Sequence, residues 1–202
     1  MSSGALSAES LSAGPWGLES LGPEGVEAAA ERIADLTRRT PVLRDAELDR
    51  LAGASCYLKA ENLQCTGAFK VRGAAAALTA STRRTPVVTA SAGNFGQGVA
   101  LAARSLGREA LVFVPTGAPR VKRRRIRRFG ADVRSIGRDF DETDRLARQF
   151  AAAEDLEFLP PFDHPRVIEG QGTLVREFLE EVPQLDALVV PCGGGGLLAG
   201  AV

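Results

Sequence analysis

The sequence is poor in the residues that mark disulfide-bonded, metal-binding or base-stacking proteins. Its 202 residues include three cysteines and one each of histidine, methionine, tryptophan and tyrosine. Cys56, Cys65 and Cys192 are odd in number, and their spacing fits neither a zinc site nor a disulfide framework. We therefore expect no metal site and reduced thiols, as in a cytoplasmic protein.

An excess of charge and long apolar runs are lacking as well. Lys+Arg and Asp+Glu both number 25, so no overall field attracts nucleic acid or a membrane. No apolar window reaches the length of a membrane span, and the first residues lack the basic and apolar regions of a secretion signal. We expect neither nucleic acid nor a membrane as a partner. The Ser/Ala/Gly-rich residues 1–22 predict a disordered N-terminal tail.

Apolar strands and amphipathic helices alternate along the rest of the chain. Helices are predicted from residue 24 to before Pro41 and over 68–79, 93–106, 119–129, 140–153 and 167–181; strands are predicted over 56–60, 86–90, 110–114, 132–136, 156–159 and 187–191. This alternation is typical of an α/β fold with open, parallel-rich sheets covered by helices. Residues 160–165 interrupt the alternation and are expected to cross between lobes.

Residues 120–128 form a basic stretch with seven cations and no acid. One interpretation is a phosphate-binding stripe. The other is the solvated face of a helix, neutralised by acids of neighbouring elements. We favour the second, because the net charge is zero and no base-stacking aromatics interleave with the cations.

Lys70 lies between Phe69 and Val71 at the start of a predicted helix. In water a lysine has a pKa of about 10.4 and is a poor nucleophile. Burial disfavours the ammonium and lowers the pKa, and a desolvated lysine can form a Schiff base with a carbonyl. On this stretch alone, an ordinary surface lysine is the simpler interpretation.

Two glycine-rich turns follow predicted strands. SAGNFGQG (residues 91–98) opens a helix whose backbone N–H groups can hold an anion, and Asn94 can donate to a ring hydroxyl or a carboxylate. PCGGGGLLAG (residues 191–200) has four consecutive glycines, whose entropic cost favours a phosphate-binding nest over a flexible turn. An amine, a donor for a ring and a phosphate nest together indicate pyridoxal 5'-phosphate.

The chain resembles the fold type II pyridoxal-phosphate enzymes, in the branch of threonine/serine dehydratases and serine racemase. The matching segments are TPV (40–42), KAENLQCTGAFKVRGA (59–74), TASAGNFGQG (89–98), FGADV (129–133), PPFDHPRVIEGQGT (160–173) and VVPCGGGGLLAG (189–200). They follow the family's order and spacing. The resemblance implies a two-lobed fold, with residues 23–85 and 161–202 in a large cofactor-binding lobe and residues 86–160 in a small αβ lobe.

The resemblance also implies roles for individual residues. Lys70 matches the Schiff-base lysine, Phe69 the aromatic residue beside it, and Asn94 the asparagine that binds the cofactor's ring hydroxyl. The phosphate loop matches Gly193, Gly194, Gly195, Gly196 and Leu197, and the loop that holds the substrate carboxylate matches Ser91, Ala92, Gly93, Asn94 and Phe95. The implied reaction is β-elimination of water from threonine or serine, giving a 2-oxo acid and ammonia. The implied assembly is a homo-oligomer, a dimer or a tetramer.

Three positions bear on the choice of reaction. Ala92 stands where the racemase has a serine that acts as its second base, so dehydration is favoured over racemisation. Phe95 stands where the family usually has histidine, which leaves open another substrate such as hydroxyaspartate, or a β-replacement. His164 is interpreted as a loop residue rather than a base.

The length of the chain departs from the family. Its members continue well past the tetraglycine loop, whereas this sequence ends at Val202. We therefore expect the larger lobe to be truncated, without the residue that pairs with the pyridine nitrogen. The alternative function is a truncated, non-catalytic or partner-dependent remnant of such an enzyme.

Overall fold

A four-stranded parallel sheet dominates one end of the molecule. The computed structural model describes residues 21–202, so the predicted tail lies outside the described residues except for its last two positions. Strands β3 (Val87–Ala90), β4 (Ala110–Val114), β5 (Asp132–Ser135) and β6 (Glu157–Phe158) pair in the order β5-β4-β3-β6. We call this part the sheet region.

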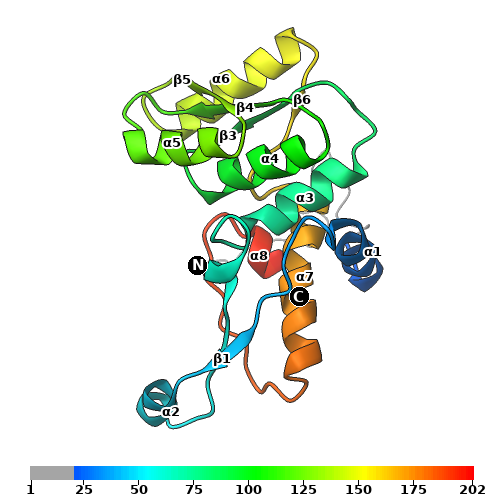
Figure 1. The fold of residues 1–202 in the computed structure, drawn as a ribbon, viewed down its shortest axis with the longest axis vertical. Helices are drawn as coiled ribbons and strands as arrows, with labels where there is room; N and C mark the ends of the chain where they lie inside the picture. Colours follow the sequence, from blue (N-terminus) through cyan, green and yellow to red (C-terminus); the bar gives the residue numbers. More distant parts are fainter. Residues whose placement is uncertain (1–20) are drawn as a thin grey trace, which may run out of the picture.

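Helices cover both faces of this sheet, as Figure 1 shows. They are α4 (Asn94–Ser105) and α5 (Arg120–Arg128) on one face and α6 (Phe140–Ala153) on the other. On β4, Val112 packs in one cluster with Phe95 and Ile126, whereas Phe113 packs in another with Ala147. Successive strand residues are therefore buried on opposite faces, which explains why the strands are apolar throughout.

The other end of the molecule is built from helices. It contains α1 (Pro23–Ile33), α7 (Pro165–Glu181) and α8 (Gly196–Ala199), and α3 (Lys70–Ala80) lies between it and the sheet region (Figure 1). A Cβ on Gly73 would lie 2.8 Å from the carbonyl oxygen of Val167, and one on Gly170 would lie 2.6 Å from that of Arg72. The glycines and alanines of α3 thus allow its backbone to pack closely against α7.

A small hairpin projects from this helical end (Figure 1). Its strands β1 (Val42–Arg44) and β2 (Tyr57–Lys59) are antiparallel, with α2 (Ala46–Ala52) between them and a 3-10 turn, η3 (Glu61–Leu63), after them. Asp45 caps α2 by accepting a hydrogen bond from the Leu48 N–H at 2.8 Å. The sequence patterns predict only the second strand of this hairpin.

The predicted alternation is confirmed through β6 and α7, with shifts at several element ends. The predicted helix from residue 24 is shorter than expected and ends at Ile33. The predicted buried strand over residues 187–191 is wrong, because these residues form no strand and Val189 is 94% exposed. An apolar segment becomes a strand only when another strand accepts its backbone hydrogen bonds, and no described residue pairs with this one in a sheet.

Arg72 is fully buried and joins three elements of the helical end. Its guanidinium donates to Glu61 of η3 at 2.8 and 2.9 Å, to Glu177 of α7 at 2.7 and 2.9 Å, and to the carbonyl oxygen of Arg38 at 3.1 Å. Burial alone would lower the pKa of Arg72, but hydrogen bonds to Glu61 and Glu177 raise the pKa above its ordinary value. Lys59 adds an ion pair to Glu177 at 3.0 Å. The first turn of α3 is therefore held by charge as well as by packing.

Replacing Arg72 with alanine should lower the free energy of unfolding by about 3–5 kcal/mol, because two carboxylates lose their buried cation. Denaturation in urea measures the change. The matched control is Arg138→Ala, which removes an exposed ion pair with Glu142 and should leave the midpoint almost unchanged. Equal midpoints for the two variants would contradict a structural role for Arg72.

Stability should also fall in acid through Glu177. Burial raises the pKa of Glu177, but Arg72 and Lys59 more than offset this, so the folded-state pKa lies below the ordinary 4.5. The unfolded state then binds the proton more readily, so the stabilisation is complete above pH 4.5 and is lost as the pH falls through the folded-state value. Urea denaturation from neutral to acid pH should show a steeper loss for the unmodified protein than for Glu177→Gln. Parallel curves would disprove this assignment.

Candidate active site

The Lys70 amine is half-buried at the first residue of α3. Its Nζ donates a hydrogen bond to the carbonyl oxygen of Pro161 at 3.2 Å. The nitrogen lies 5.4 Å from the ring centroid of Phe69 and 5.9 Å from that of Phe95. Burial lowers the pKa of Lys70 below the ordinary 10.5. Burial thus makes the neutral amine, the form that acts as a nucleophile or a base, easier to reach than in water.

The turn before α4 lies next to this lysine. A Cβ on Gly98 would lie 2.9 Å from the Cα of Val71, so α4 packs directly on the first turn of α3. The Ser91 N–H donates to the carbonyl oxygen of Phe113 at 3.0 Å, and the Ser91 Oγ accepts from the Gly93 N–H at 3.2 Å. The turn is therefore fixed to the carboxyl end of the sheet, where ligands of open α/β sheets bind.

Within this turn the predicted residues differ in exposure. Asn94 is exposed at the first residue of α4, and its Oδ1 accepts from Gln97 Nε2 at 3.4 Å. Phe95 is buried, and Ala92 packs on the apolar cluster around it. The Phe95 ring lies near the Lys70 amine, as its distance of 5.9 Å shows, while the amide of Asn94 remains accessible.

The glycine loop lies before α8 and has the backbone that a phosphate cradle needs. Gly195 has a φ of 82°, a left-handed conformation that favours glycine. The N–H groups of Gly193, Gly194 and Gly195 donate to no acceptor in residues 21–202. The adjoining Leu197 is buried in a cluster with Leu174 and Val175, and Phe69 packs against the same cluster. The loop and the start of α3 are thereby brought together.

Phe162 is a site residue that the sequence patterns do not reveal. A Cβ on Gly194 would lie 2.3 Å from its Cγ, and one on Gly196 would lie 2.7 Å from its carbonyl oxygen. The preceding residue, Pro161, accepts the hydrogen bond of Lys70. The proline-rich turn therefore lies between the lysine and the glycine loop. Sequence signals mark it as a turn, but nothing in them pairs it with glycines thirty residues away.

These features fit pyridoxal phosphate. The lysine amine has a lowered pKa, and the N–H groups of Gly193, Gly194 and Gly195 lack acceptors in the described part of the chain. A Cβ added at Gly193 or Gly195 would meet no atom within 4 Å, so open space adjoins this loop. An anion of the size of a phosphate can therefore approach the backbone there.

A family model described as pyridoxal-phosphate dependent enzyme matches residues 33–202. The chain belongs to this family. It is 43% identical over 176 residues to the L-threo-3-hydroxyaspartate ammonia-lyase of Saccharomyces cerevisiae, a match that covers 86% of this chain and 54% of the relative. It is 40% identical over 190 residues to the biosynthetic L-threonine dehydratase IlvA of Pasteurella multocida, a match that covers 91% of this chain and 37% of the relative.

A solved structure leads to the same family. The processed form of threonine deaminase isoform 2 from Solanum lycopersicum superposes with a TM-score of 0.82 at 35% identity, covering 89% of this chain and 52% of that one. The two-lobed α/β fold expected of fold type II enzymes is thereby confirmed for the part present. The chain spans about half the length of the curated relatives it matches.

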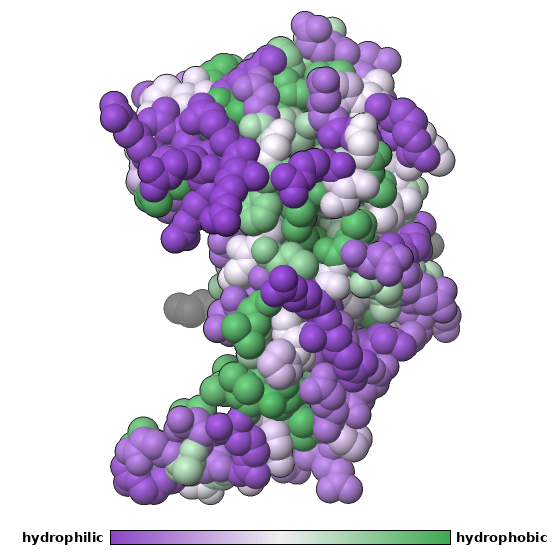
Figure 2. Space-filling view, in the orientation of Figure 1, coloured by the Kyte–Doolittle hydropathy of each residue, from purple (hydrophilic) through white to green (hydrophobic). Residues whose placement is uncertain are grey.

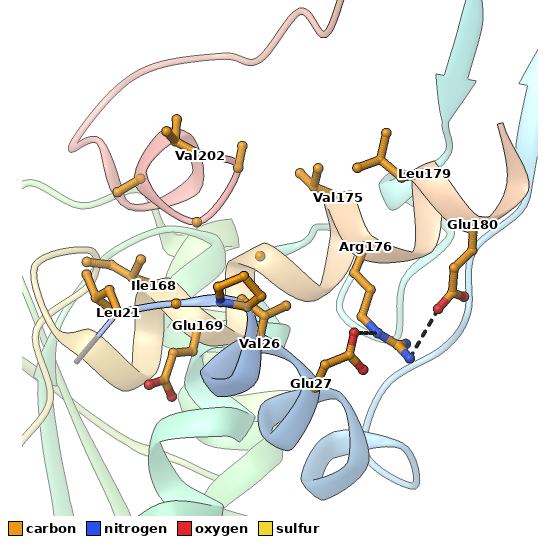
Figure 3. Close-up of a pocket in the computed structure, with 16 residues that line it drawn as sticks. Leu21, Val26, Glu27, Ile168, Glu169, Val175, Arg176, Leu179, Glu180 and Val202 are labelled. Atoms are coloured by element: carbon orange, nitrogen blue, oxygen red, sulfur yellow. Dashed lines mark hydrogen bonds and ion pairs between the residues drawn. The ribbon is translucent and has the colours of Figure 1, made fainter. Parts of the chain in front are cut away.

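A pocket with a different lining lies at another place (Figure 3). Its volume is about 620 Å³, and it lies between α1, α7 and α8. Val26, Ile168 and Val175 line it, and Arg176 pairs with Glu27 and Glu180 at its edge. It contains neither Lys70 nor Asn94, and none of the predicted phosphate-loop residues 193–197. It is therefore an apolar groove without the chemistry of the site.

Other kinds of site are not found in residues 21–202. They contain no group of histidine, cysteine and acidic side chains that could hold a metal ion. No helix among them combines the length and apolarity needed to cross a membrane. His164 accepts a hydrogen bond from the Arg166 N–H at 3.2 Å as the N-cap of α7, and burial lowers its pKa.

The contact between Phe162 and the glycine loop can be tested by two single substitutions. Gly194→Ala forces the ring away from the loop and should lower the free energy of unfolding by about 1–3 kcal/mol. Gly193→Ala adds a methyl group to open space and should change it little. Urea denaturation of both variants in the absence of cofactor makes the comparison. A larger loss for Gly193→Ala than for Gly194→Ala would contradict the packing described.

Proposed function

We propose that the protein is a pyridoxal-phosphate-dependent ammonia-lyase that removes water from a small hydroxy amino acid, threonine or serine, to give a 2-oxo acid and ammonia. The observation that carries the proposal is the half-buried Lys70 amine, which has a lowered pKa and donates to Pro161, the neighbour of Phe162, which contacts the glycine loop. The chain that carries it belongs to the pyridoxal-phosphate dependent enzymes. The names of the relatives, a threonine dehydratase and a hydroxyaspartate ammonia-lyase, support this reaction class.

In this proposal Lys70 and the glycine loop hold the two ends of the cofactor. Lys70 binds its aldehyde end, with Phe69 beside it, and Asn94 binds the ring hydroxyl. The phosphate is held by the loop residues Gly193, Gly194, Gly195, Gly196 and Leu197. Bound pyridoxal phosphate supplies an electron sink for the substrate's Cα electrons.

The remaining residues bind the substrate and move its proton. The turn residues Ser91, Ala92, Gly93, Asn94 and Phe95 hold the substrate carboxylate. Lys70, released when the substrate binds, accepts the Cα proton as a neutral amine, which its lowered pKa favours. Phe69 and Phe95 exclude water from that amine. Ala92 offers no second proton donor, so we propose elimination rather than racemisation.

We extend the proposal to the larger organisation of the protein. Residues 23–85 and 161–202 belong to a large cofactor-binding lobe, and residues 86–160 to a small lobe centred on the parallel sheet. The protein assembles as a homo-oligomer and works in the cytoplasm. Cys56, Cys65 and Cys192 are free thiols, which suits a reducing compartment.

The site can be tested by locating the cofactor on the chain. Lysines occur only at positions 59, 70 and 122. After incubation with equimolar pyridoxal phosphate and borohydride reduction, peptide mapping should find the label on Lys70. Lys59 is held in ion pairs with Glu177 and Glu181 at 3.0 Å, and Lys122 is exposed, so both serve as internal controls. Equal labelling of Lys70 and Lys122 would contradict the assignment.

Assays of 2-oxo acid and ammonia release separate this function from its alternative. The protein with cofactor should act on threonine or serine, and Lys70→Ala should abolish turnover. Label on Lys70 without turnover of any hydroxy amino acid would instead favour the non-catalytic or partner-dependent remnant.

A further inference from the structure

A pocket of about 440 Å³ adjoins the predicted substrate turn. It is lined by Cys65, Thr66, Gly67, Asn94, Gln97, Arg125, Arg128 and Phe129. Gly67 lies three residues before Lys70, and Asn94 precedes Phe95, whose ring faces the Lys70 amine. The pocket is therefore bounded by the two segments that flank the lysine. Its volume lies within the range of about 300–1,000 Å³ that is usual for small-ligand sites.

Two arginines of α5 give this pocket its charge. Arg125 and Arg128 are exposed, and no acidic side chain lines the pocket with them. None of the ion pairs in residues 21–202 involves a cation of α5. The hydrophilic area over α5 stands out in Figure 2. The helix is a solvated face, as expected, but no acid in residues 21–202 forms an ion pair with it. Arg125 and Arg128 therefore have no carboxylate partner there.

A monocarboxylic hydroxy amino acid does not need these charges. Threonine and serine carry one carboxylate, and the backbone of the turn before α4 is assigned to it. Their side chains are neutral, so a threonine side chain facing two guanidinium groups gains no charge-assisted hydrogen bond. A second carboxylate would gain them, because guanidinium groups bind carboxylates with paired N–H donors.

We propose that Arg125 and Arg128 recognise a second carboxylate, so that the preferred substrates are β-hydroxy amino acids with an acidic side chain, of the 3-hydroxyaspartate class. This inference rests on the proposed reaction, the removal of water from a hydroxy amino acid, and names an acidic amino acid in place of threonine or serine as the preferred substrate. The α-carboxylate binds at the turn of residues 91–95, and the side-chain carboxylate lies toward α5. Both arginines act in binding and take no part in the chemical step.

Binding without catalysis provides the first test. Succinate and butyrate have the same carbon chain and differ in one carboxylate. Isothermal titration calorimetry at low salt, with and without cofactor, should show tighter binding of succinate. Arg125→Gln/Arg128→Gln should weaken succinate binding about tenfold, equivalent to 1.4 kcal/mol. The control Arg120→Gln/Arg124→Gln removes the same charge from exposed positions of α5 outside the pocket and should leave binding unchanged.

Two results of the titration would overturn the inference. The first is equal binding of succinate and butyrate by the unmodified protein. The second is an equal loss of succinate binding in both double variants. Such a result would mean that the overall charge of α5, and not the two pocket arginines, determines the affinity for succinate. Circular dichroism of each variant establishes that it is folded before the comparison is made.

Turnover provides the second test and separates the two proposals. The ratio of kcat/KM for threo-3-hydroxyaspartate to that for threonine should exceed one and fall about tenfold in Arg125→Gln/Arg128→Gln, through KM. The control variant should keep the ratio. If the protein turns over threonine and the kcat/KM ratio is the same in Arg125→Gln/Arg128→Gln as in the unmodified protein, the substrate inference alone is contradicted. Absence of cofactor from Lys70 would sink the proposed function itself.

Discussion

The buried guanidinium of Arg72 is the interaction on which the position of the site depends. It lies two residues after Lys70, and its partners Glu61 and Glu177 come from the turn before α3 and from α7. A buried charge is tolerated only when its hydrogen bonds are satisfied, so α3 can occupy just one position between these elements. The lysine at the start of α3 takes its position from that constraint.

Close backbone packing completes the placement. Gly98 allows α4 to approach Val71, and Gly194 and Gly196 allow the glycine loop to approach Phe162. In each case a methyl group would occupy the space of a neighbouring atom. The glycines near the lysine therefore differ in what they do. Some have N–H groups without an acceptor in residues 21–202, and others allow neighbouring segments to pack closely. A small site can be assembled this way without a large apolar core around it.

The balance of charge differs between the whole chain and its parts. The chain has zero net charge, yet α5 carries seven cations that no described acid pairs with. The acids are used elsewhere, in the network of Arg72 and in pairs on α6 such as Arg148 with Asp144. The chain is neutral as a whole, but Arg125 and Arg128 make the surface beside the predicted substrate turn positive. Electrostatic specificity is set at this local scale, because charges separated by more than about 10 Å are screened.

Secondary structure could be predicted from the sequence wherever a residue's conformation is decided by its neighbours in the chain. The alternation of strands and helices follows from periodicity and backbone preference. The strand predicted over residues 187–191 failed for the opposite reason, because pairing requires a distant partner.

Sequence alone thus determined the α/β class, the reactive lysine and the two glycine-rich turns as candidates. Only the tertiary structure decided that the turn of Pro161 and Phe162 contacts both Lys70 and the glycine loop, that Arg72 fixes the first turn of α3, and that Arg125 and Arg128 meet Asn94 in one pocket. Most of these facts depend on contacts between residues that are 30 or more positions apart in the chain. Such contacts leave no periodic signal, since they arise from how the helices pack rather than from any single segment.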